Sequence, residues 1–235
     1  MIQAYIFDVF GTLVDWRTGV ANEARAVFSA KGIDVDPVAF AAFWRSRYHP
    51  AMERIRSGKR AYVQLDVLHL ENLDEALEEF KIARHFTDEE KLAFNHAWEK
   101  LPPWADTVAG LTALKTHAII APCSNGSIAL MARLAKFGGL PWDAIVGADI
   151  AKMYKPQPET YLASCAALRL PPEQVMMVAC HNNDLQAARA AGLKTGFFPR
   201  PLEHGPGQTK DLQAEGPWDR VAADLNDLAV KVISG

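Results

Sequence analysis

The second half of the chain alternates short, almost entirely apolar runs with longer segments of helical periodicity. We expect strands at residues 4–8, 117–121, 144–146, 175–179, 195–198 and 220–222. Helices are expected at residues 127–137, 159–168 and 185–191 and at the end of the chain. Gly192 is the expected C′ residue of the third of these helices. Apolar strands that alternate with helices are typical of a parallel sheet covered on both faces. The pattern therefore predicts a doubly wound α/β core.

The segment from residue 15 to residue 98 has no strand pattern. Its apolar side chains recur at helical spacing, as Val20, Ala24, Val27 and Phe28, then Phe40, Phe43 and Trp44, then Leu92, Phe94 and Trp98. Asp36 is an expected N-cap, with Pro37 at the first helical position. Thr87 and Glu90 form an expected capping box. We interpret the segment as a helical cap inserted after the first strand.

The insertion divides the chain into two expected domains. Residues 1–14 and 99–235 form the predicted α/β core, and residues 15–98 form the predicted cap. Residues 101–104, Leu-Pro-Pro-Trp, are the expected linker back to the core. Ligands of open α/β sheets bind at the carboxyl ends of the strands. We therefore expect a site at that edge of the sheet, roofed by the cap.

Composition narrows the class of protein. The chain has 235 residues, of which 49% are hydrophobic, and a formal net charge of −3. These values are typical of a globular protein that has neither nucleic acid nor an anionic membrane as a partner. No run approaches the roughly 20 apolar residues of a membrane span, and the N-terminus lacks the basic and apolar regions of a signal peptide. The three cysteines lack zinc spacing and favour a reducing, cytoplasmic location.

The first candidate for chemistry is Asp8, at the carboxyl end of the first predicted strand. Gly11 and Thr12 follow in a turn just beyond it. A carboxylate in this position suggests a nucleophile. Phe10, two positions after Asp8, cannot donate a proton. This motif resembles that of the haloacid dehalogenase superfamily, whose phosphatases carry a second aspartate as general acid at the place of Phe10. The resemblance therefore implies a substrate whose leaving group needs no protonation, and a halide meets this condition.

Four separated motifs, each at a predicted strand end or loop, extend this pattern over the whole chain. They are Asp8-Val9-Phe10-Gly11-Thr12, Ser124-Asn125-Gly126, Lys155-Pro156 and Cys180-His181-Asn182-Asn183-Asp184. In this order, and with the cap after the first motif, they resemble the haloacid dehalogenase superfamily and, within it, the L-2-haloacid dehalogenase type. The resemblance implies a Rossmann-like α/β core with a helical cap.

The resemblance assigns catalytic roles to several side chains. It implies that Asp8 is the nucleophile, that Thr12 orients it, and that Lys155 neutralises charge beside it and keeps it ionised. Asp184 is expected to position or activate the water that opens the ester. Tyr161 matches a family tyrosine that shapes the site, although a tyrosine at this position is equally compatible with a core aromatic.

The resemblance also assigns substrate-binding side chains. Arg45 matches the family arginine that reaches the departing halide, where a guanidinium stabilises developing negative charge. Arg47 is the competing assignment, because a shift of two residues would exchange their helix faces. Ser124 is expected to hold the substrate carboxylate, and Asn125 to face the halide. The expected substrate-binding and halide-binding set also includes Phe10, Trp44 and Asn182, with Trp44 either packing the cap or walling the halide pocket.

The last motif argues against a metal. Magnesium-dependent phosphatases of the superfamily carry two acids four residues apart, and here these places hold Cys180 and Asp184. Magnesium prefers oxygen ligands, and a thiol is a poor one. We therefore expect no metal and no cofactor. His181 and Ala179 stand where better-known L-2-haloacid dehalogenases have Asn and Ser. An imidazole can act as a base near neutral pH, so the identity of the hydrolytic base stays open.

The resulting hypothesis is hydrolytic dehalogenation of short 2-haloalkanoic acids to 2-hydroxy acids through an ester on Asp8. The expected partners are a small halocarboxylate and a halide ion. Asp15-Trp16-Arg17, together with the last motif, also resembles a subgroup with defluorinating members, which adds fluoroacetate to haloacetates and 2-halopropionates. Dimers are common in the family, and a homodimer is compatible with the aromatic cap. The alternatives are a phosphatase of a small phosphomonoester and a non-catalytic protein that binds an anion or a partner.

Overall fold

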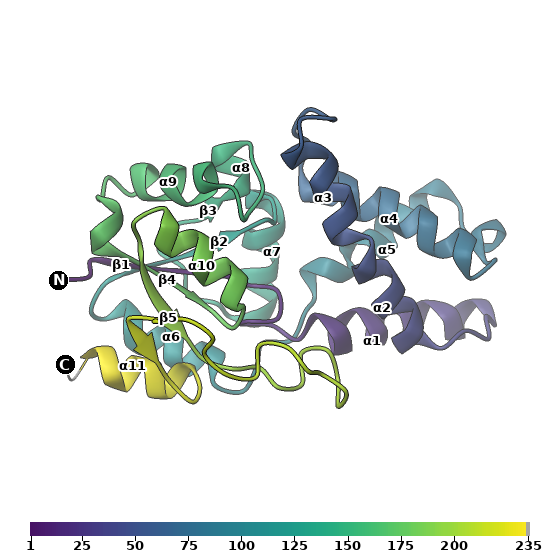
Figure 1. Cartoon of the computed structure of the whole chain (residues 1–235). Helices are drawn as coiled ribbons and strands as arrows, with labels where there is room; N and C mark the ends of the chain where they lie inside the picture. Colours follow the sequence, from purple (N-terminus) through teal and green to yellow (C-terminus); the bar gives the residue numbers. More distant parts are fainter. Residues whose placement is uncertain (234–235) are drawn as a thin grey trace.

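A six-stranded, all-parallel sheet forms the centre of the molecule in the computed structural model, which describes residues 1–233 (Figure 1). Its strands are β1 (Ala4–Phe7), β2 (Ile119–Ser124), β3 (Val146–Gly147), β4 (Val175–Ala179), β5 (Lys194–Phe197) and β6 (Arg220–Val221). Their order in the sheet is β3-β2-β1-β4-β5-β6. Because β1 lies between β2 and β4, the residues after β1 emerge in the middle of the carboxyl edge.

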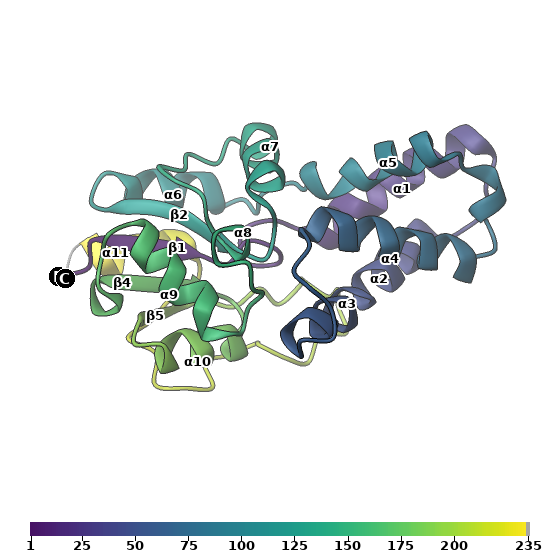
Figure 2. The ribbon, with the colours of Figure 1, turned by 90° about the horizontal axis from the view of Figure 1, so that it is seen from above.

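Helices cover both faces of the sheet, which confirms the doubly wound fold. One face carries α6 (Thr107–Lys115) and α11 (Leu225–Ile233), and the other carries α9 (Pro158–Ala167) and α10 (Asn182–Ala190) (Figure 2). The remaining helices of this part are α7 (Ile128–Gly138), α8 (Ala148–Ala151) and the short 3-10 helix η3 (Pro172–Gln174). Tyr5 and Phe7 of β1 belong to one buried cluster, whereas Ala4 and Ile6 belong to the other. The central strand is apolar throughout because successive side chains enter different cores.

A helical insertion follows β1 and extends from the carboxyl edge of the sheet (Figures 1 and 2). Its helices are α1 (Trp16–Lys31), α2 (Pro37–Ser46), α3 (Tyr48–Arg56), α4 (Leu65–Glu79) and α5 (Asp88–Asn95), with the 3-10 helices η1 (Ala83–His85) and η2 (His96–Glu99). Aromatic side chains pack between them, with ring centroids 5.1 Å apart for Phe28 and Phe40 and 5.4 Å apart for Trp44 and Phe94. The predicted helical cap is thus present, and its boundaries at residues 15 and 98 stay a prediction.

Several hydrogen bonds join the cap to the core, and three of them lie near the loop that carries Lys155. Arg56 donates to the carbonyl oxygen of Lys155 (2.9 Å), and Gln64 donates to Asp149 (3.0 Å). The hydroxyl of Tyr154 donates to the carbonyl oxygen of Val63 (2.7 Å). These bonds fix the cap next to the loop that carries Lys155. Within residues 1–233, every helix is too short or too polar to span a bilayer.

The local signals read from the sequence are confirmed in most places. Asp36 caps α2, Thr87 and Glu90 form the capping box of α5, and Gly192 adopts a positive φ of 93° after α10. Most element boundaries differ from the predicted ones by one to three residues, and two of these differences bear on the site. Strand β2 does not stop at the predicted residue 121 but continues to Ser124. Pro122 pairs with Phe7 of β1, and the pairing of β2 with β3 starts at the next residue, Cys123. Helix α10 begins at Asn182, so the polar residues of the last motif form its first turn. The apolar pattern does not single out α4 or α6.

Candidate active site

A cavity of about 980 Å³ lies at the carboxyl edge of the sheet, between the core, the cap and the loop after β5. We call residues 198–219 the late loop; in Figure 1 it runs from the core toward α1. Predicted site residues that line the cavity are Asp8, Phe10, Arg45, Asn125, Lys155, His181, Asn182 and Asp184. The other predicted residues, Thr12, Trp44, Ser124 and Tyr161, are buried around it. Chain segments far apart in sequence therefore meet at one place.

The carboxylate of Asp8 has three polar side-chain partners in the cavity. Its Oδ1 accepts a hydrogen bond from Nζ of Lys155 (2.8 Å). Its Oδ2 accepts one from the hydroxyl of Thr12 (2.7 Å) and lies 3.0 Å from Nδ1 of His181. Burial by itself would raise the pKa of Asp8, but the charges of Lys155 and His181 outweigh it and hold the pKa well below its ordinary value. Asp8 is therefore ionised near neutral pH.

Lys155 joins Asp8 to a second carboxylate. Its Nζ also donates to Oδ2 of Asp184, and the hydroxyl of Tyr161 donates to Oδ1 of Asp184. Burial opposes the ammonium, yet Asp184 and Asp8 together raise the pKa of Lys155. Burial raises the pKa of Asp184, and the attraction of Lys155 only partly offsets this effect. Tyr161 is thus both a fully buried aromatic and a partner of the site.

His181 lies between Asp8 and a carboxylate that we had not predicted, Glu203. Nε2 of His181 is 2.9 Å from Oε2 of Glu203, and Nε1 of Trp16 donates to Oε1 of the same carboxylate (3.1 Å). Burial would raise the pKa of Glu203, but His181 lowers it to about 2. Burial disfavours the charged imidazole, yet Cys180, Glu203 and Asp8 raise the pKa of His181 well above its ordinary value. Without substrate, His181 is therefore an imidazolium that lies between the carboxylates of Asp8 and Glu203.

Glu203 lies in the late loop, where no sequence motif marks it as functional. Arg200 anchors the start of this loop by donating to the carbonyl oxygen of Thr12 (2.8 Å) and pairing with Asp106. Gly11 provides the space for the carboxylate: its φ is 87°, and a Cβ built there would lie 2.1 Å from Oε1 of Glu203. The turn at Gly11 is the only sequence signal for this contact. It indicates that space is needed next to the backbone of Gly11 but not that the side chain of Glu203 fills it.

Arg45 enters the cavity from α2 in the cap. Its guanidinium carbon lies 3.9 Å from the ring centroid of Tyr48 and 5.7 Å from that of Phe10. Nη1 of Arg45 is buried and has no hydrogen-bond partner within residues 1–233. Arg47 instead forms a partly exposed pair with Glu75 on the outside of the cap. Of the two competing arginines, Arg45 is the one that the fold directs into the cavity.

The other predicted binding residues have protein partners. Asn125 donates to the hydroxyl of Tyr48 (3.0 Å) and accepts from the backbone N–H of Lys155 (2.8 Å), which ties the cap to the core. Ser124 accepts from the N–H of Gly126. The last two residues of this set are Asn182 and Trp44. The side-chain amide of Asn182 is hydrogen-bonded to Asp211, Gln213 and Trp218. The indole N–H of Trp44 donates to the carbonyl oxygen of His69. Direct contact of Ser124, Trp44 or Asn182 with a substrate stays a prediction.

The donor set does not fit the magnesium ion of the superfamily phosphatases. The ammonium of Lys155 contacts both Asp8 and Asp184, the two acids that would share the ion. The remaining positions hold Phe10 and Cys180, whose side chains offer no hard oxygen ligand. We therefore assign no step to magnesium.

The parallel sheet, the helical cap and the buried aspartate–lysine pair at the sheet edge define a capped α/β protein with the haloacid dehalogenase-like fold. Residues 2–192 match the family model of the haloacid dehalogenase-like hydrolases. The chain is 30% identical to (S)-2-haloacid dehalogenase 1 of Pseudomonas sp. (strain CBS-3) over 203 residues, 83% of each chain. The chain thus belongs to the haloacid dehalogenase-like hydrolase family.

Two solved structures are similar over almost the whole chain. The crystal structure of the defluorinating L-2-haloacid dehalogenase Rha0230 has a TM-score of 0.97 and 48% identity, and the match covers 99% of this chain and 95% of that one. The L-2-haloacid dehalogenase PA0810 has a TM-score of 0.96 and 44% identity, with both chains covered completely.

Proposed function

We propose that this protein hydrolyses the carbon–halogen bond of short 2-haloalkanoic acids and releases 2-hydroxy acids and halide. The observation that carries the proposal is an ionised Asp8 in a cavity whose neighbouring position holds Phe10, so that no acid is available there for a leaving oxygen. The names of the similar proteins, which include haloacid dehalogenases and a defluorinating member, support the same reaction.

In the first half-reaction, an oxygen of Asp8 attacks C2 of the substrate as the C2–halogen bond breaks. An ester forms on Asp8, and the halide leaves with the bonding electrons. Arg45 is the proposed receptor for the halide, because its buried Nη1 lacks a partner in the described chain and Phe10 and Tyr48 shield it from water. Lys155 and Thr12 hold Asp8 in the attacking orientation.

In the second half-reaction, we assign the base to His181. Esterification removes the negative charge of Asp8, which lowers the pKa of His181 and allows its proton to pass to solvent in the cavity. The neutral Nδ1 then accepts a proton from the water that attacks the Asp8 carbonyl carbon. Glu203, on Nε2, stabilises the imidazolium that forms. As the tetrahedral intermediate collapses, the leaving oxygen of the product takes the second proton of the attacking water. The alcohol product departs, and Asp8 is again an ionised carboxylate beside the imidazolium.

Asp184 is the rival base. Its pKa is raised, which suits proton transfer, but one of its oxygens accepts from Lys155 and the other from Tyr161. His181 has one nitrogen directed at Asp8, the group whose carbonyl carbon water must attack. Geometry therefore favours His181, with Asp184 holding Lys155 in place.

The proposal includes a cytoplasmic location, which the three buried free cysteines support because a reducing compartment preserves thiols. Assembly as a homodimer stays a prediction that light scattering of the purified protein can check.

The experiment is a halide-release panel with fluoro-, chloro- and bromoacetate and both enantiomers of 2-chloropropionate, with and without a magnesium chelator. We expect halide and 2-hydroxy acid in equal amounts, with no loss of rate in chelator. A single turnover in heavy-oxygen water should place the label in Asp8. Chelator-sensitive phosphate release from a small monoester would support the phosphatase instead. Absence of halide from every substrate would support a non-catalytic anion-binding protein.

A further inference from the structure

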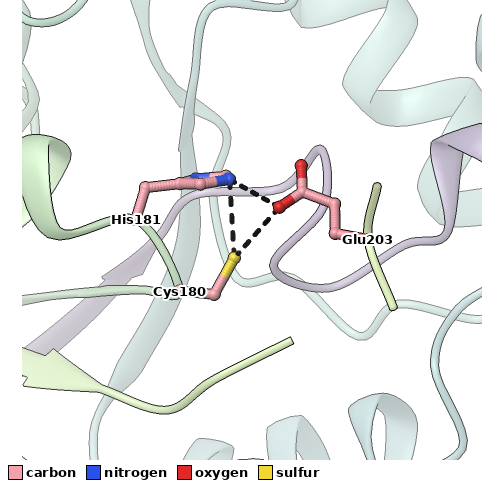
Figure 3. Close-up of side chains that lie close together, drawn as sticks. All are labelled: Cys180, His181 and Glu203. Atoms are coloured by element: carbon pink, nitrogen blue, oxygen red, sulfur yellow. Dashed lines mark hydrogen bonds and ion pairs between the residues drawn. The ribbon is translucent and has the colours of Figure 1, made fainter. Parts of the chain in front are cut away.

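Cys180, His181 and Glu203 direct three potential metal-ligand atoms at a single point (Figure 3). Sγ of Cys180 lies 3.5 Å from Nε2 of His181 and 3.7 Å from Oε2 of Glu203, and the nitrogen and oxygen are 2.9 Å apart. The proposed dehalogenation gives Cys180 no task. We propose that these side chains form a binding site for a zinc ion, whose occupation blocks the hydrolytic half-reaction.

The triangle of ligand atoms has the dimensions of a zinc site. With zinc–ligand bonds of about 2.0 to 2.3 Å, neighbouring ligands in a tetrahedron lie about 3.3 to 3.6 Å apart. The three separations here fall within a few tenths of an ångström of that range, so small side-chain shifts suffice. Sulfur, imidazole nitrogen and carboxylate oxygen are zinc ligands, and the sulfur discriminates against magnesium.

The groups behind each ligand already hold it in place. Nδ1 of His181 points at Asp8, which forms the carboxylate–histidine arrangement common at zinc sites. Nε2, which faces Glu203 and Cys180, would exchange its proton for the ion. Trp16 donates to Oε1 of Glu203 and leaves Oε2 for the ion. The hydroxyl of Thr12 lies 3.3 Å from Sγ of Cys180. The orientation of the three ligands thus depends on contacts present before any ion binds.

An ion can reach the site from the cavity, since His181 and Glu203 both line its wall, with Cys180 buried behind them. The fourth coordination position would face the cavity, as in zinc sites with three protein ligands. Binding displaces the thiol proton of Cys180 and the Nε2 proton of His181. Zinc affinity should therefore fall as the pH is lowered.

Bound zinc would change the chemistry of Asp8 in two ways. His181, with zinc on Nε2 and its remaining proton on Nδ1, can no longer accept a proton from water. The added positive charge also weakens Asp8 as a nucleophile. This inhibitory consequence rests on the proposed function, whereas zinc binding itself does not.

The test uses the full chain, freed of metal with a chelator and studied without substrate. Cobalt(II) serves as the spectroscopic probe and zinc is titrated by calorimetry. We expect one ion per chain and a thiolate-to-cobalt charge-transfer band. Cys180→Ser should remove the band and weaken zinc binding at least about 100-fold. Cys123→Ser and Cys165→Ser are the matched controls, because both cysteines are buried and neither belongs to the ligand cluster, so they should leave the band and the affinity unchanged.

His181→Asn tests the same site while leaving the thiol of Cys180 in place. It should also weaken zinc binding at least about 100-fold. Absence of the band in the unmodified protein, or its persistence in Cys180→Ser, would overturn the proposal. Equal loss in Cys123→Ser would do the same, since it would locate the thiolate elsewhere. Zinc binding by a chain that releases no halide would leave the metal site standing and remove only the proposed function.

Discussion

The floor of the cavity, formed by the edge of the sheet, and its roof, formed by the cap, differ in how their charged side chains are paired. The floor, at the edge of the sheet, is charged, and its carboxylates Asp8, Asp184 and Glu203 each have a cationic partner. The roof, from the cap, combines aromatic rings such as Trp16 and Tyr48 with polar side chains, among them Arg45, whose Nη1 lacks a hydrogen-bond partner within the described residues. The floor is complete before a substrate arrives, whereas the roof leaves a cation ready for an anion.

The difference follows from the cost of burying charge. A buried ion is tolerated when it is paired and its hydrogen bonds are satisfied. Lys155 and His181 meet that condition on the floor. Arg45 forms no ion pair within the described residues. It faces the ring of Tyr48 and neighbouring rings, and it interacts with the charge of Glu203 only at longer range, which is a weaker compensation. A departing halide would give the guanidinium of Arg45 the anionic partner that it lacks. The cap would therefore stabilise the reaction most when negative charge develops on the halogen.

The largest expected effect tests whether the floor carries the covalent step. Asp8→Asn keeps the shape of the side chain and removes its charge, so turnover of any accepted haloacid should fall at least about 10⁴-fold. Halide release gives the rate, and far-UV circular dichroism checks that the variant folds. Retained activity would mean that water attacks the substrate directly.

The next effect tests the roof. Arg45→Gln should lower kcat/KM about 10²- to 10³-fold, because the guanidinium acts on charge that develops in the transition state. Arg47→Gln is the matched control, since its partly exposed pair with Glu75 lies outside the cavity, and it should change kcat/KM less than about twofold. Similar losses in both variants would show that the cap acts through its stability and not through Arg45.

A smaller effect separates the two half-reactions on the floor. Glu203→Gln preserves most of the shape of Glu203 but removes the charge behind His181, so ester hydrolysis should slow about 10- to 100-fold. Rapid-quench measurement should then reveal a burst of about one halide per chain before a slow steady rate. Glu215→Gln, at an exposed position on the same cavity, is the control. A reduced burst rate would mean that Glu203 serves the alkylation step instead.

The smallest effect is on stability. The folded pKa of His181 is raised, so its contribution is fully present below about pH 6.5 and is lost as the pH rises through the folded pKa. The folded pKa of Glu203 is about 2, so its contribution is present above about pH 4.5 and is lost as the pH falls toward 2. The pair therefore stabilises the fold most between about pH 4.5 and 6.5.

Urea unfolding at pH 6 to 9 measures this effect. From the proton of His181, the free energy of unfolding should fall by up to about 1.4 kcal/mol per pH unit. His181→Asn should flatten that slope, and Arg45→Gln, on the roof, should keep it. An unchanged slope in His181→Asn would contradict the raised pKa.

Much of the fold was predictable because its signals are local. Three such signals depend only on residues a few positions apart. They are the apolar run of β1, the capping box of Thr87 and Glu90, and Gly192 after α10. Asp8 was predictable for a related reason, because the residues that follow parallel strands converge on one edge of the sheet. Lys155 and Arg45 were predicted from the family resemblance. The sequence left Arg47 as a competitor of Arg45, because the rotation of α2 against the core decides which of them lines the cavity.

The sequence by itself determined an α/β core with a helical insertion and a carboxylate at the end of the first strand without an acid two residues on. Its resemblance to a family added a basic partner for that carboxylate. Only the tertiary structure decided that Glu203 lies behind His181, that Cys180 completes a ligand triangle, and that Arg45 faces the cavity. Sequence periodicity records which face of an element is apolar. It does not record which distant loop fills the space above Gly11, because that depends on packing of segments almost two hundred residues apart.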